Sequence, residues 1–507
     1  MEVINIVWFK KDLRLSDHAP LYYAIKAGLP ILLIYCFEPS QTNHPTYGEV
    51  HRAFAASSLA DLQQQLNPYG HVLHISNLEF TRVLEVLLSH YKIHSVFTHH
   101  EVTMLHTRNR IEAVAQVCAN NNITFNQLTS DSILSKSLVE PQNWLQQRNA
   151  WINSDLFAIS LDKIQKANLS EEIIQQIFPL NLTERKSKGR KQLKYENIQI
   201  IAGETKAQQL LNDFLLNKAK GEYRKNRNIA FNAGTWGSRL SASLAFGNIN
   251  IRQIYRQLKS LQFNAAAKLD LKAFKAQLLL RDFAKQVFEI NPQLEHQNLN
   301  YVVNGIRLKW NEEMFDAFTS AKTGFPLIDA SVLCLSKTGF ISHSLRALLI
   351  SFVAHHLWLD WRKATPYFAG QMIDFDPGIY FWNTQIIAGC TGLTPLNILN
   401  PIKEAGRTDK NGLFIKQWLP RFKLVPGALC GQPQSLKQLE QEMYHLRLGR
   451  EYPLPIVNIN ETELFAKQHL EKIYQKPVAI KETAAILESL LPVPAILNNG
   501  KLNLSRN

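Results

Sequence analysis

Residues 340–361 read FISHSLRALLISFVAHHLWLDW, a long apolar stretch with its hydrophobic side chains at helical spacing. Arg346, three histidines and two tryptophans interrupt it. Such polar groups argue against a membrane span and favour a helix in the core of a large globular domain. We therefore expect one buried helix of ~20 residues here, with a helical domain around it.

Helical spacing continues on both sides of this stretch. From about residue 205 onward, apolar residues recur every three or four positions with few strand-like alternations. The clearest segments are KAQQLLNDFLL (206–216), NIRQIYRQLKSL (250–261), LDLKAFKAQLLLRDFAKQVF (269–288) and PLIDASVLCL (326–335). The pattern predicts an all-α domain over 205–507.

The N-terminal part has a different pattern, in which short β-branched runs alternate with helical ones. The runs are INIVWF (4–9), ILLIYCF (31–37), HVLHIS (71–76), SVFTHH (95–100) and ITFNQL (123–128). Nearly continuous apolar strands separated by helices predict an α/β doubly wound parallel-sheet domain over 1–130. Ser16 is the expected cap of the first helix. No GxGxxG or Walker loop is present, so the sequence shows no obvious dinucleotide or ATP loop.

The composition is that of a globular protein with a large core. The chain has 507 residues, of which 46% are hydrophobic, so two or three domains are expected. Its 5 cysteines are scattered, which indicates free thiols in a reducing compartment and argues against a zinc or iron–sulfur site. We expect a cytoplasmic protein without a membrane partner, divided into 1–130, a linker over 131–204, and 205–507.

The chain is strongly basic, with 56 Lys and Arg against 42 Asp and Glu, a formal net charge of +14. This charge favours a polyanionic partner such as nucleic acid, and a merely basic soluble enzyme is an equally good explanation. The segment ERKSKGRKQLK (184–194) is either a solvated inter-domain linker or a DNA-facing basic segment, and the linker is favoured.

Several segments, in order and spanning residues ~3 to ~422, resemble the photolyase/cryptochrome family of blue-light flavoproteins. They are VWFKKDLRLSDHAPL (7–21), SRLSASLAFGNIN (238–250), TGFPLIDASVLCLSKTGFISHSLRALLISFVAHHLWLDWR (323–362) and NPIKEAGRTDKNGLFIKQWLP (400–420). The resemblance implies an N-terminal antenna domain, a linker and a C-terminal helical domain that holds FAD.

The resemblance also assigns residues to the flavin. A loop with hydroxyls and an Arg at the start of a helix suits a pyrophosphate. Asp374 and Asp376 lie in an apolar segment, where burying an acid is costly without a partner. The family pairs the counterparts of Arg346 and Asp374 beside the isoalloxazine ring, on two successive helical segments. The implied cofactor-binding residues are Tyr223, Thr235, Ser238, Arg239, Leu240, Ser241, Arg281, Arg346, Asp374, Asp376 and Tyr380.

The sequence departs from the family in its electron relay. The Trp that normally hands an electron to the excited flavin is Thr384 here, whereas Trp361 and Trp310 match the middle and distal members. Tyr380 lies four residues before Thr384 and so shares its helix face, which makes it a candidate electron donor or a shield of the ring. Trp382 is a second candidate, for which core packing is the favoured explanation.

The lesion pocket departs from the family as well. Where enzymes that repair cyclobutane dimers carry a Glu and a Trp, this chain has Gln277 and Leu280. An Asn-Arg pair becomes His343-Ser344. Six-four photolyases have a His at the position of His343 that protonates the lesion, and an ordinary His pKa near ~6.5 suits that task. A structural role for His343 is favoured over proton donation.

The resemblance therefore implies a blue-light DNA photolyase with FAD, which would act as a monomer on UV-damaged DNA. The alternatives are a cryptochrome-type photoreceptor without repair activity and a basic nucleic-acid-binding protein that lost its cofactor. Glu101 lies where an acid can contact an antenna, so a second chromophore of pterin or flavin type is a further expectation.

Overall fold

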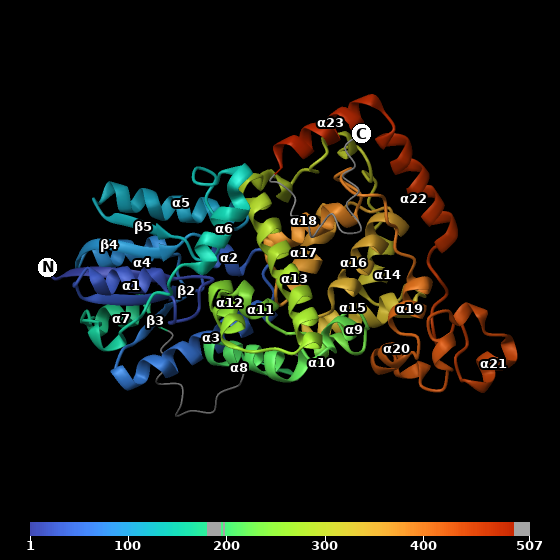
Figure 1. The fold of residues 1–507 in the computed structure, drawn as a ribbon, viewed down its shortest axis with the longest axis horizontal. Coiled ribbons are helices and arrows are strands. Elements are labelled where there is room, and N and C mark those ends of the chain that lie inside the picture. The colour runs from blue at the N-terminus through green and yellow to red at the C-terminus, as the bar shows by residue number, and fades with distance from the viewer. Residues whose placement is uncertain (180–193, 196–197, 491–507) are drawn as a thin grey trace. The chain divides into compact units, whose positions relative to one another are not determined.

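The computed structural model describes residues 1–179, 194–195 and 198–490, and the chain forms two compact units. Unit 1 comprises Met1–Leu215, Ser238–Phe263 and Ile373–Gly378, and unit 2 comprises Leu216–Gly237, Asn264–Met372 and Ile379–Asn507. Each unit is therefore assembled from segments that are distant in the sequence (Figure 1). The described residues between 131 and 204, predicted as a linker, fall within unit 1.

Unit 1 is built on a five-stranded sheet of order β3-β2-β1-β4-β5, in which every neighbouring pair is parallel. Its strands are β1 (Val3–Phe9), β2 (Ile31–Cys36), β3 (Leu73–Ser76), β4 (Lys92–His99) and β5 (Thr124–Leu128). All five predicted strands are thus confirmed, as is their parallel arrangement.

Helices cover both faces of this sheet, as its nearly continuous apolar strands require. One hydrophobic core joins one face to α1 (Ala19–Lys26) and α3 (Glu49–Leu66). A second core joins the opposite face to α4 (Phe80–Leu88), α5 (Leu105–Asn120) and α7 (Glu171–Ile177). The remaining elements of unit 1 are α2 (Pro39–Thr42), α6 (Trp144–Asn153), α8 (Glu204–Asp213), α11 (Ser241–Ala245), α12 (Ile251–Ser260), β6 (Lys194–Tyr195) and β7 (Ile198–Gln199).

The cap predicted for α1 was wrong. The helix begins after His18, whose Nδ1 accepts a hydrogen bond from the Leu21 N–H at 3.1 Å. Asp17, with a φ of +53°, turns the chain between Ser16 and the helix, so α1 begins two residues later than the predicted cap requires. The Ser16 N–H donates to the Glu204 carboxylate of α8 at 3.1 Å.

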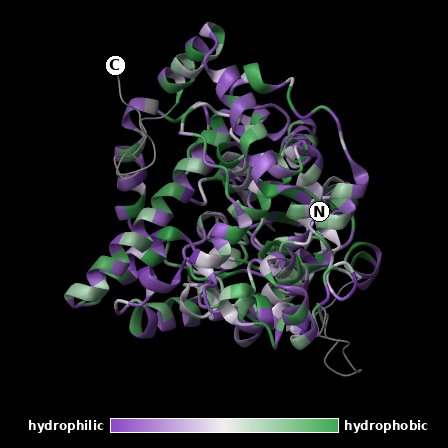
Figure 2. Cartoon of the chain, turned by 90° about the vertical axis from the view of Figure 1, so that its right-hand side faces the viewer, coloured by the Kyte–Doolittle hydropathy of each residue, from purple (hydrophilic) through white to green (hydrophobic). Residues whose placement is uncertain are grey.

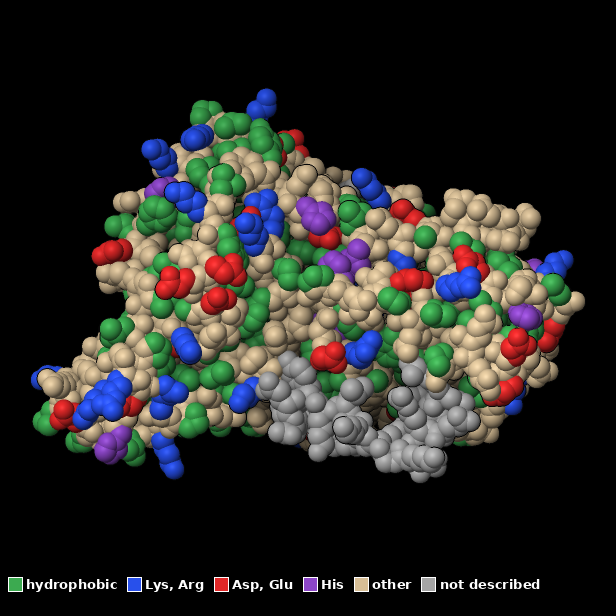
Figure 3. All heavy atoms as spheres, turned by 180° about the vertical axis from the view of Figure 1, so that it is seen from behind, with side chains coloured by type: hydrophobic (Ala, Val, Ile, Leu, Met, Phe, Trp, Pro, Cys, Tyr) green, Lys and Arg blue, Asp and Glu red, His purple; other side chains and the backbone are tan. Residues whose placement is uncertain are grey.

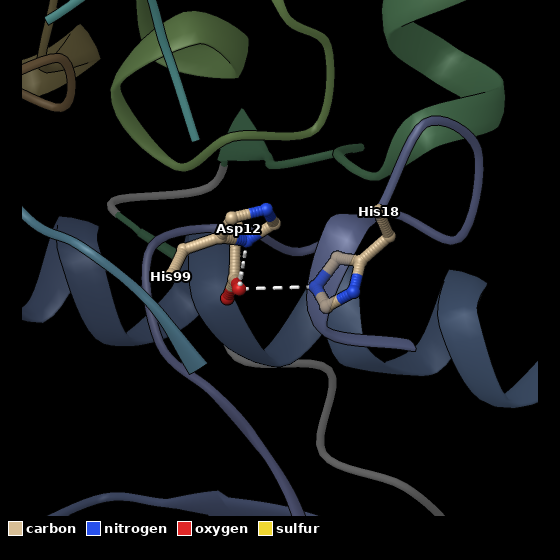
Figure 4. A group of neighbouring side chains, drawn as sticks. All are labelled: Asp12, His18 and His99. Atoms are coloured by element: carbon tan, nitrogen blue, oxygen red, sulfur yellow. Dashed lines mark hydrogen bonds and ion pairs between the residues drawn. The ribbon is translucent and has the colours of Figure 1, made fainter. Parts of the chain in front are cut away.

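Asp12, His18 and His99 form a buried group, here called the Asp12 cluster (Figure 4). His18 Nε2 and His99 Nδ1 both lie within hydrogen-bond distance of Asp12 Oδ2, at 3.0 and 2.7 Å. Because His18 Nδ1 accepts the helix-capping bond, the neutral ring carries its proton on Nε2 and donates it to Asp12. A protonated nitrogen cannot ligate a metal, so the cluster is a hydrogen-bonded hub at the end of β1 and β4.

The named elements in the described part of unit 2 are all helices. Hydrophobic and hydrophilic residues alternate around individual helices (Figure 2). Its helices include α9 (Tyr223–Asn226), α10 (Ala233–Trp236), α13 (Ala265–Ile290), α14 (Glu312–Thr319), α15 (Pro326–Thr338), α16 (His343–Ser351), α17 (Trp361–Gln371), α19 (Pro401–Thr408), α20 (Leu413–Trp418), α21 (Gln438–Met443), α22 (Ile459–Tyr474) and α23 (Pro477–Ser489). Helix α18 (Pro377–Ile387) starts in unit 1 and continues in unit 2.

The single long helix predicted over 340–361 was wrong. Helix α16 ends at Ser351 and passes into a π-helix, Phe352–His356. The chain then turns at Trp358, whose φ is +53°, and α17 starts at Trp361. A π-helix and a left-handed residue break the helical path that the apolar spacing suggests.

Two further expectations concern membrane-spanning helices and the basic segment 184–194. None of the helices in the described part of the chain is long and apolar enough to span a membrane. Of the basic segment 184–194, all but Lys194 lies outside the described residues, so its role as linker or DNA contact stays a prediction.

Candidate functional site

Asp374 and Asp376 lie in a short non-helical segment before α18, which corrects the prediction that Asp374 is helical. Both are buried, with 7% of their surface exposed. The intervening Phe375 and the following Pro377 line a small cavity of unit 1 together with Phe246. Two carboxylates are thus held in an apolar setting, where a charge needs compensation.

Arg346 lies on α16 and is partly buried. Its Nε donates to the Ile341 carbonyl at 3.0 Å, and its guanidinium lies 5.6 Å from the centre of the Phe340 ring. Arg346 belongs to unit 2 and Asp374 to unit 1, so their ion pair stays a prediction.

The predicted phosphate loop runs from α10 to α11. Thr235 and Ser241 are exposed, Ser238 and Arg239 are partly buried, and Leu240 is buried. Arg239 has a φ of +58°, a conformation that is uncommon for a residue with a side chain. Helix α11 is only five residues long.

Tyr223, a predicted flavin contact, is positioned by a residue that the sequence analysis missed. The buried Asp270 of α13 accepts hydrogen bonds from the N–H groups of Gly221 (2.7 Å), Tyr223 (3.1 Å) and Arg224 (3.2 Å). A carboxylate that collects three backbone donors fixes the turn from which Tyr223 projects. The available signal was an acid on the apolar face of the helical pattern in LDLKAF.

Arg281 also lies on α13 and is ion-paired at 2.9 Å with the buried Asp282. The pocket positions Gln277 and Leu280 precede it on the same helix. Gln277 is exposed and Leu280 is partly buried.

Tyr380 and Trp361 are connected through one hydroxyl group. The Tyr380 phenol donates to Thr365 Oγ1 at 3.4 Å, and Thr365 Oγ1 donates to the Trp361 carbonyl at 3.0 Å. Both aromatic side chains are buried, and burial raises the pKa of Tyr380 to about 12. Both also pack edge-on against Phe381, at ring-centre distances of 5.4 Å for Tyr380 and 6.0 Å for Trp361.

The other two tryptophans of the predicted relay have different surroundings. Trp382 is buried on α18 and packs edge-on against Phe283 at 5.4 Å, as the core-packing explanation expects. Trp310 is partly exposed, and its indole N–H donates to the Glu312 carboxylate at 2.5 Å.

His343 and Ser344 start helix α16 beside the loop that follows α9. The Ser344 hydroxyl lies 3.1 Å from Asn228 Oδ1, and the Ala230 N–H donates to the Thr408 carbonyl at 2.9 Å. Desolvation by the surrounding protein, together with the charges of Arg346 and Arg227, lowers the pKa of His343 to about 4, although its side chain is exposed at the surface. This pKa lies well below the ordinary value near ~6.5 that the proton-donor role assumes.

Exposed cations lie on the same segments. Arg224 and Lys225 belong to α9, with 45% and 68% of their side-chain surface exposed, and Lys410 follows α19. Arg224 is ion-paired with the buried Asp270 at 3.3 Å, and Lys225 is ion-paired with Glu222 at 2.9 Å. Lys and Arg side chains are also interspersed with Asp and Glu on the face seen in Figure 3.

A second polar region lies at the carboxyl ends of β1, β2 and β4, where ligands of parallel sheets usually bind. A small cavity there is lined by Lys10, Glu38, Glu101 and Arg110, among others. Glu38 and Arg110 form a buried ion pair at 3.0 Å, and desolvation raises the pKa of Glu38 to about 7. Both carboxylate oxygens of Glu101 are buried without a hydrogen bond to any described residue.

The predicted cofactor-binding groups have the chemistry that a flavin dinucleotide needs. Hydroxyls and guanidiniums suit its pyrophosphate, and buried carboxylates suit its N–H and hydroxyl donors. These groups occur in both units, with Ser238, Arg239 and the two acids in unit 1 and Arg281 and Arg346 in unit 2.

Two family models match the chain. Residues 5–144 match the model described as DNA photolyase, and residues 274–472 match the FAD binding domain of DNA photolyase. The first covers the sheet of unit 1, and the second covers α14–α21 with most of α13 and α22.

Full-length relatives carry two different names. The chain is 26% identical to a cryptochrome DASH of Synechocystis sp. over 500 residues, which cover 92% of this chain and 98% of that protein. It is 27% identical to a deoxyribodipyrimidine photo-lyase of Alkalihalophilus pseudofirmus over 481 residues, which cover 90% of this chain and 95% of that one.

Solved structures have the same fold. A class III photolyase from Agrobacterium tumefaciens superposes with a TM-score of 0.78 at 24% identity, covering 94% of this chain and 98% of that one. An archaeal photolyase from Sulfolobus tokodaii with two FAD molecules superposes with a TM-score of 0.74 at 25% identity, covering 93% and 99%.

Proposed function

This chain belongs to the photolyase/cryptochrome family of flavoproteins, and on that premise we propose that it is a blue-light DNA photolyase. It repairs UV-induced pyrimidine photoproducts by light-driven electron transfer, as a light-dependent carbon–carbon lyase. It acts in the cytoplasm as a monomer. The matched FAD-binding domain includes five of the eleven assigned flavin contacts, namely Arg281, Arg346, Asp374, Asp376 and Tyr380.

FAD, when bound, supplies the absorption of blue light and the redox chemistry of the reaction. The residues that would hold its pyrophosphate are Thr235, Ser238, Arg239 and Ser241, with Leu240 beside them and Arg281 adding a cation. Tyr223 would contact it from the turn that Asp270 fixes. Arg346 and Asp374 would pair beside the ring, and Asp376 would line the same site.

The protein's electron supply runs through aromatic side chains. Trp361 takes the place of the inner donor because threonine at position 384 cannot be oxidised. Tyr380 would shield the isoalloxazine ring. Its hydroxyl is connected to the backbone carbonyl of Trp361 through the Thr365 hydroxyl. Trp382 serves as core packing.

The single observation that best supports DNA as the partner is the polar, cationic surface at the start of α16. Asn228, His343 and Ser344 form its centre, and Arg224, Lys225 and Lys410 lie on the neighbouring segments. Cations around uncharged hydrogen-bonding groups suit DNA, since phosphates need charge and an extruded base needs donors and acceptors. His343 acts there as a neutral hydrogen-bonding group.

The test is repair in light by purified, reduced protein. Oligonucleotides that carry either a cyclobutane dimer or a six-four photoproduct are illuminated with blue light, and a dark sample is the control. Loss of one lesion in light alone is expected. Unchanged amounts of both lesions would reject the repair function.

The second candidate is a cryptochrome-type photoreceptor, which the exposed Gln277 and the partly buried Leu280 favour. An amide and an alkyl group replace a carboxylate and a stacking ring, and base stacking contributes about 1–3 kcal/mol. Blue-light reduction of the flavin without repair of either lesion would support this candidate.

We also propose a second chromophore in the N-terminal unit. The buried, unbonded carboxylate of Glu101 in the strand-end cavity offers acceptors for the N–H groups of a pterin- or flavin-type ring. Chromatography of the pigments released from denatured protein tests this proposal, and FAD as the sole pigment would reject it.

A further inference from the structure

Trp310 lies where an electron route would meet the solvent. Its ring packs against Phe315 of α14 at 4.8 Å, and the ammonium of Lys363 lies 5.8 Å from its ring centre. Lys363 is two residues from Trp361 on the first turn of α17. The buried indole of Trp361 and the partly exposed indole of Trp310 therefore flank the same helix start.

The hydrogen bond of Trp310 distinguishes it from the other relay tryptophan. Its N–H donates to the Glu312 carboxylate at 2.5 Å, whereas the Trp361 N–H donates to the neutral amide oxygen of Asn298 at 2.9 Å. A carboxylate can accept a proton from an indole that has lost an electron, and an amide oxygen cannot.

Trp358 is the competing outlet, because it is also partly exposed and precedes Trp361 by three residues. The buried guanidinium of Arg307 lies 4.7 Å from its ring centre. A cation over the ring stabilises the neutral indole and repels the positive charge created by oxidation. The cation beside Trp310 is farther away, is exposed and screened, and is offset by Glu312.

Taking Trp310 as the distal member of the relay, as the resemblance implies, we propose from these contacts that Glu312 is its built-in proton acceptor. The inference rests on the proposed light-driven function. One electron passes from Trp310 to oxidised Trp361, and the indole N–H proton moves to a Glu312 oxygen. The products are a neutral indolyl radical and a carboxylic acid, and a thiol in solution then returns the electron while Glu312 returns the proton.

The proton transfer makes the charge separation last. An oxidised but still protonated Trp310 would take its electron back from the flavin side, whereas the neutral radical lacks the charge that drives this return. A base already in hydrogen-bond contact needs no diffusional encounter, so deprotonation does not depend on buffer.

The experiment is laser-flash spectroscopy on the purified, FAD-containing protein, which follows flavin reduction and the tryptophan radical separately. The two protonation states of the radical have different visible absorption. Glu312→Gln is the test variant, and Glu313→Gln, its exposed neighbour on α14, is the matched control. Trp310→Phe and Trp358→Phe identify the radical.

In the wild-type protein and in Glu313→Gln, we expect a deprotonated radical that forms at a rate independent of buffer concentration. In Glu312→Gln the protonated radical should persist at least about tenfold longer and decay faster with more buffer base. Trp310→Phe should abolish the radical signal, and Trp358→Phe should retain it.

Two outcomes would overturn the inference, and they can be told apart. If no variant, nor the wild-type protein, shows flavin reduction after the flash, the proposed function fails and this inference fails with it. If the flavin is reduced but Glu312→Gln behaves like the wild-type protein, or Trp310→Phe retains the signal, only the roles of Trp310 and Glu312 are refuted.

Discussion

Among single residues, Asp374 is a buried acid whose charge requires a compensating partner. Its carboxylate and that of Asp376 are each only 7% exposed in a segment of otherwise apolar side chains. Ionised carboxylates are retained in such places when a cation or several donors compensate them. In the proposed site, Arg346 and the flavin would supply this compensation.

The Asp374→Asn variant should therefore lose bound FAD. In the proposed pair an amide could not balance the charge of Arg346, and an unpaired buried charge costs about 3–5 kcal/mol. We expect the ratio of flavin to protein absorbance to fall at least tenfold after dialysis, while Asp316→Asn on α14, used as a control, retains the flavin. Full occupancy in Asp374→Asn would contradict the assignment.

The Asp12 cluster makes stability depend on pH. Burial, together with the neighbouring His18, lowers the pKa of His99 to about 3, and hydrogen bonds from the two histidines hold the pKa of Asp12 well below its usual value. An unfolded His titrates near ~6.5, so the unfolded chain binds more protons than the folded one between about pH 6.5 and 3. The stability contributed by a neutral His99 is thus complete above about pH 6.5 and is lost as the pH falls through this window.

Replacing His99 by Asn should flatten that dependence. Between pH 7 and pH 5 the free energy of unfolding should fall by about 2 kcal/mol less in His99→Asn than in the wild-type protein. Urea unfolding at the two pH values measures the difference. The exposed His90→Asn is the control, and equal losses in all three proteins would show that His99 does not cause the effect.

Among the elements, Arg307 stabilises the break between helices α16 and α17. Its Nε donates to the Ala354 carbonyl of the π-helix at 2.6 Å, and one of its terminal nitrogens donates to the Ala388 carbonyl after α18 at 2.9 Å. Carbonyls at helix ends lack partners within the helix and carry partial negative charge. A single buried guanidinium therefore joins two helix ends and places Trp358 beneath it.

Arg307→Met should destabilise the fold by about 3 kcal/mol, because two buried carbonyls lose a charged donor and Trp358 loses its cation. The exposed Arg450→Met, with 75% of the native side chain accessible, should change stability by less than about 0.5 kcal/mol. Denaturant unfolding compares them. A near-neutral Arg307→Met would mean that packing alone maintains the break.

At the scale of the whole molecule, the first unit is completed by residues far along the chain. The Asn248 amide donates to the Leu13 carbonyl at 2.8 Å, and Arg252 is ion-paired with the buried Asp17 at 2.6 Å. Asn250 also donates to Asp17. The sheet domain therefore needs α12 to compensate its own buried acid.

A fragment of residues 1–263 should accordingly be more stable than one of residues 1–215. Removing the guanidinium that compensates a buried carboxylate costs about 3–5 kcal/mol, enough to lower the melting temperature by several degrees. Thermal unfolding followed by circular dichroism provides the comparison. Equal melting temperatures would show that unit 1 does not depend on the later segment.

The positive charge of the molecule should also be measurable in DNA binding. If Lys410 contacts a phosphate, Lys410→Ala should weaken binding to damaged and undamaged DNA alike and reduce the slope of log K against log salt by about 1. Lys481→Ala on α23 removes an exposed cation and is the control. Equal slopes in both variants would place the DNA contact elsewhere.

The sequence by itself determined the class of each region, because periodicity is a local property. Alternating β-branched runs and helical spacing predict a parallel sheet followed by helices, and the five strands lie where those runs are. The residue types that suit a flavin could likewise be found from their order in the chain.

Only the tertiary structure decided how these residues are used. His18 and not Ser16 caps α1, because the chain turns at Asp17 (φ +53°) and the helix begins only after His18. The helix predicted over 340–361 breaks where Arg307 binds carbonyls from two helix ends. Asp270 gains its role by accepting hydrogen bonds from the backbone N–H groups of a turn 46 to 49 residues away. Such partners are chosen by contact in space, and a local pattern of hydrophobic residues carries no information about them.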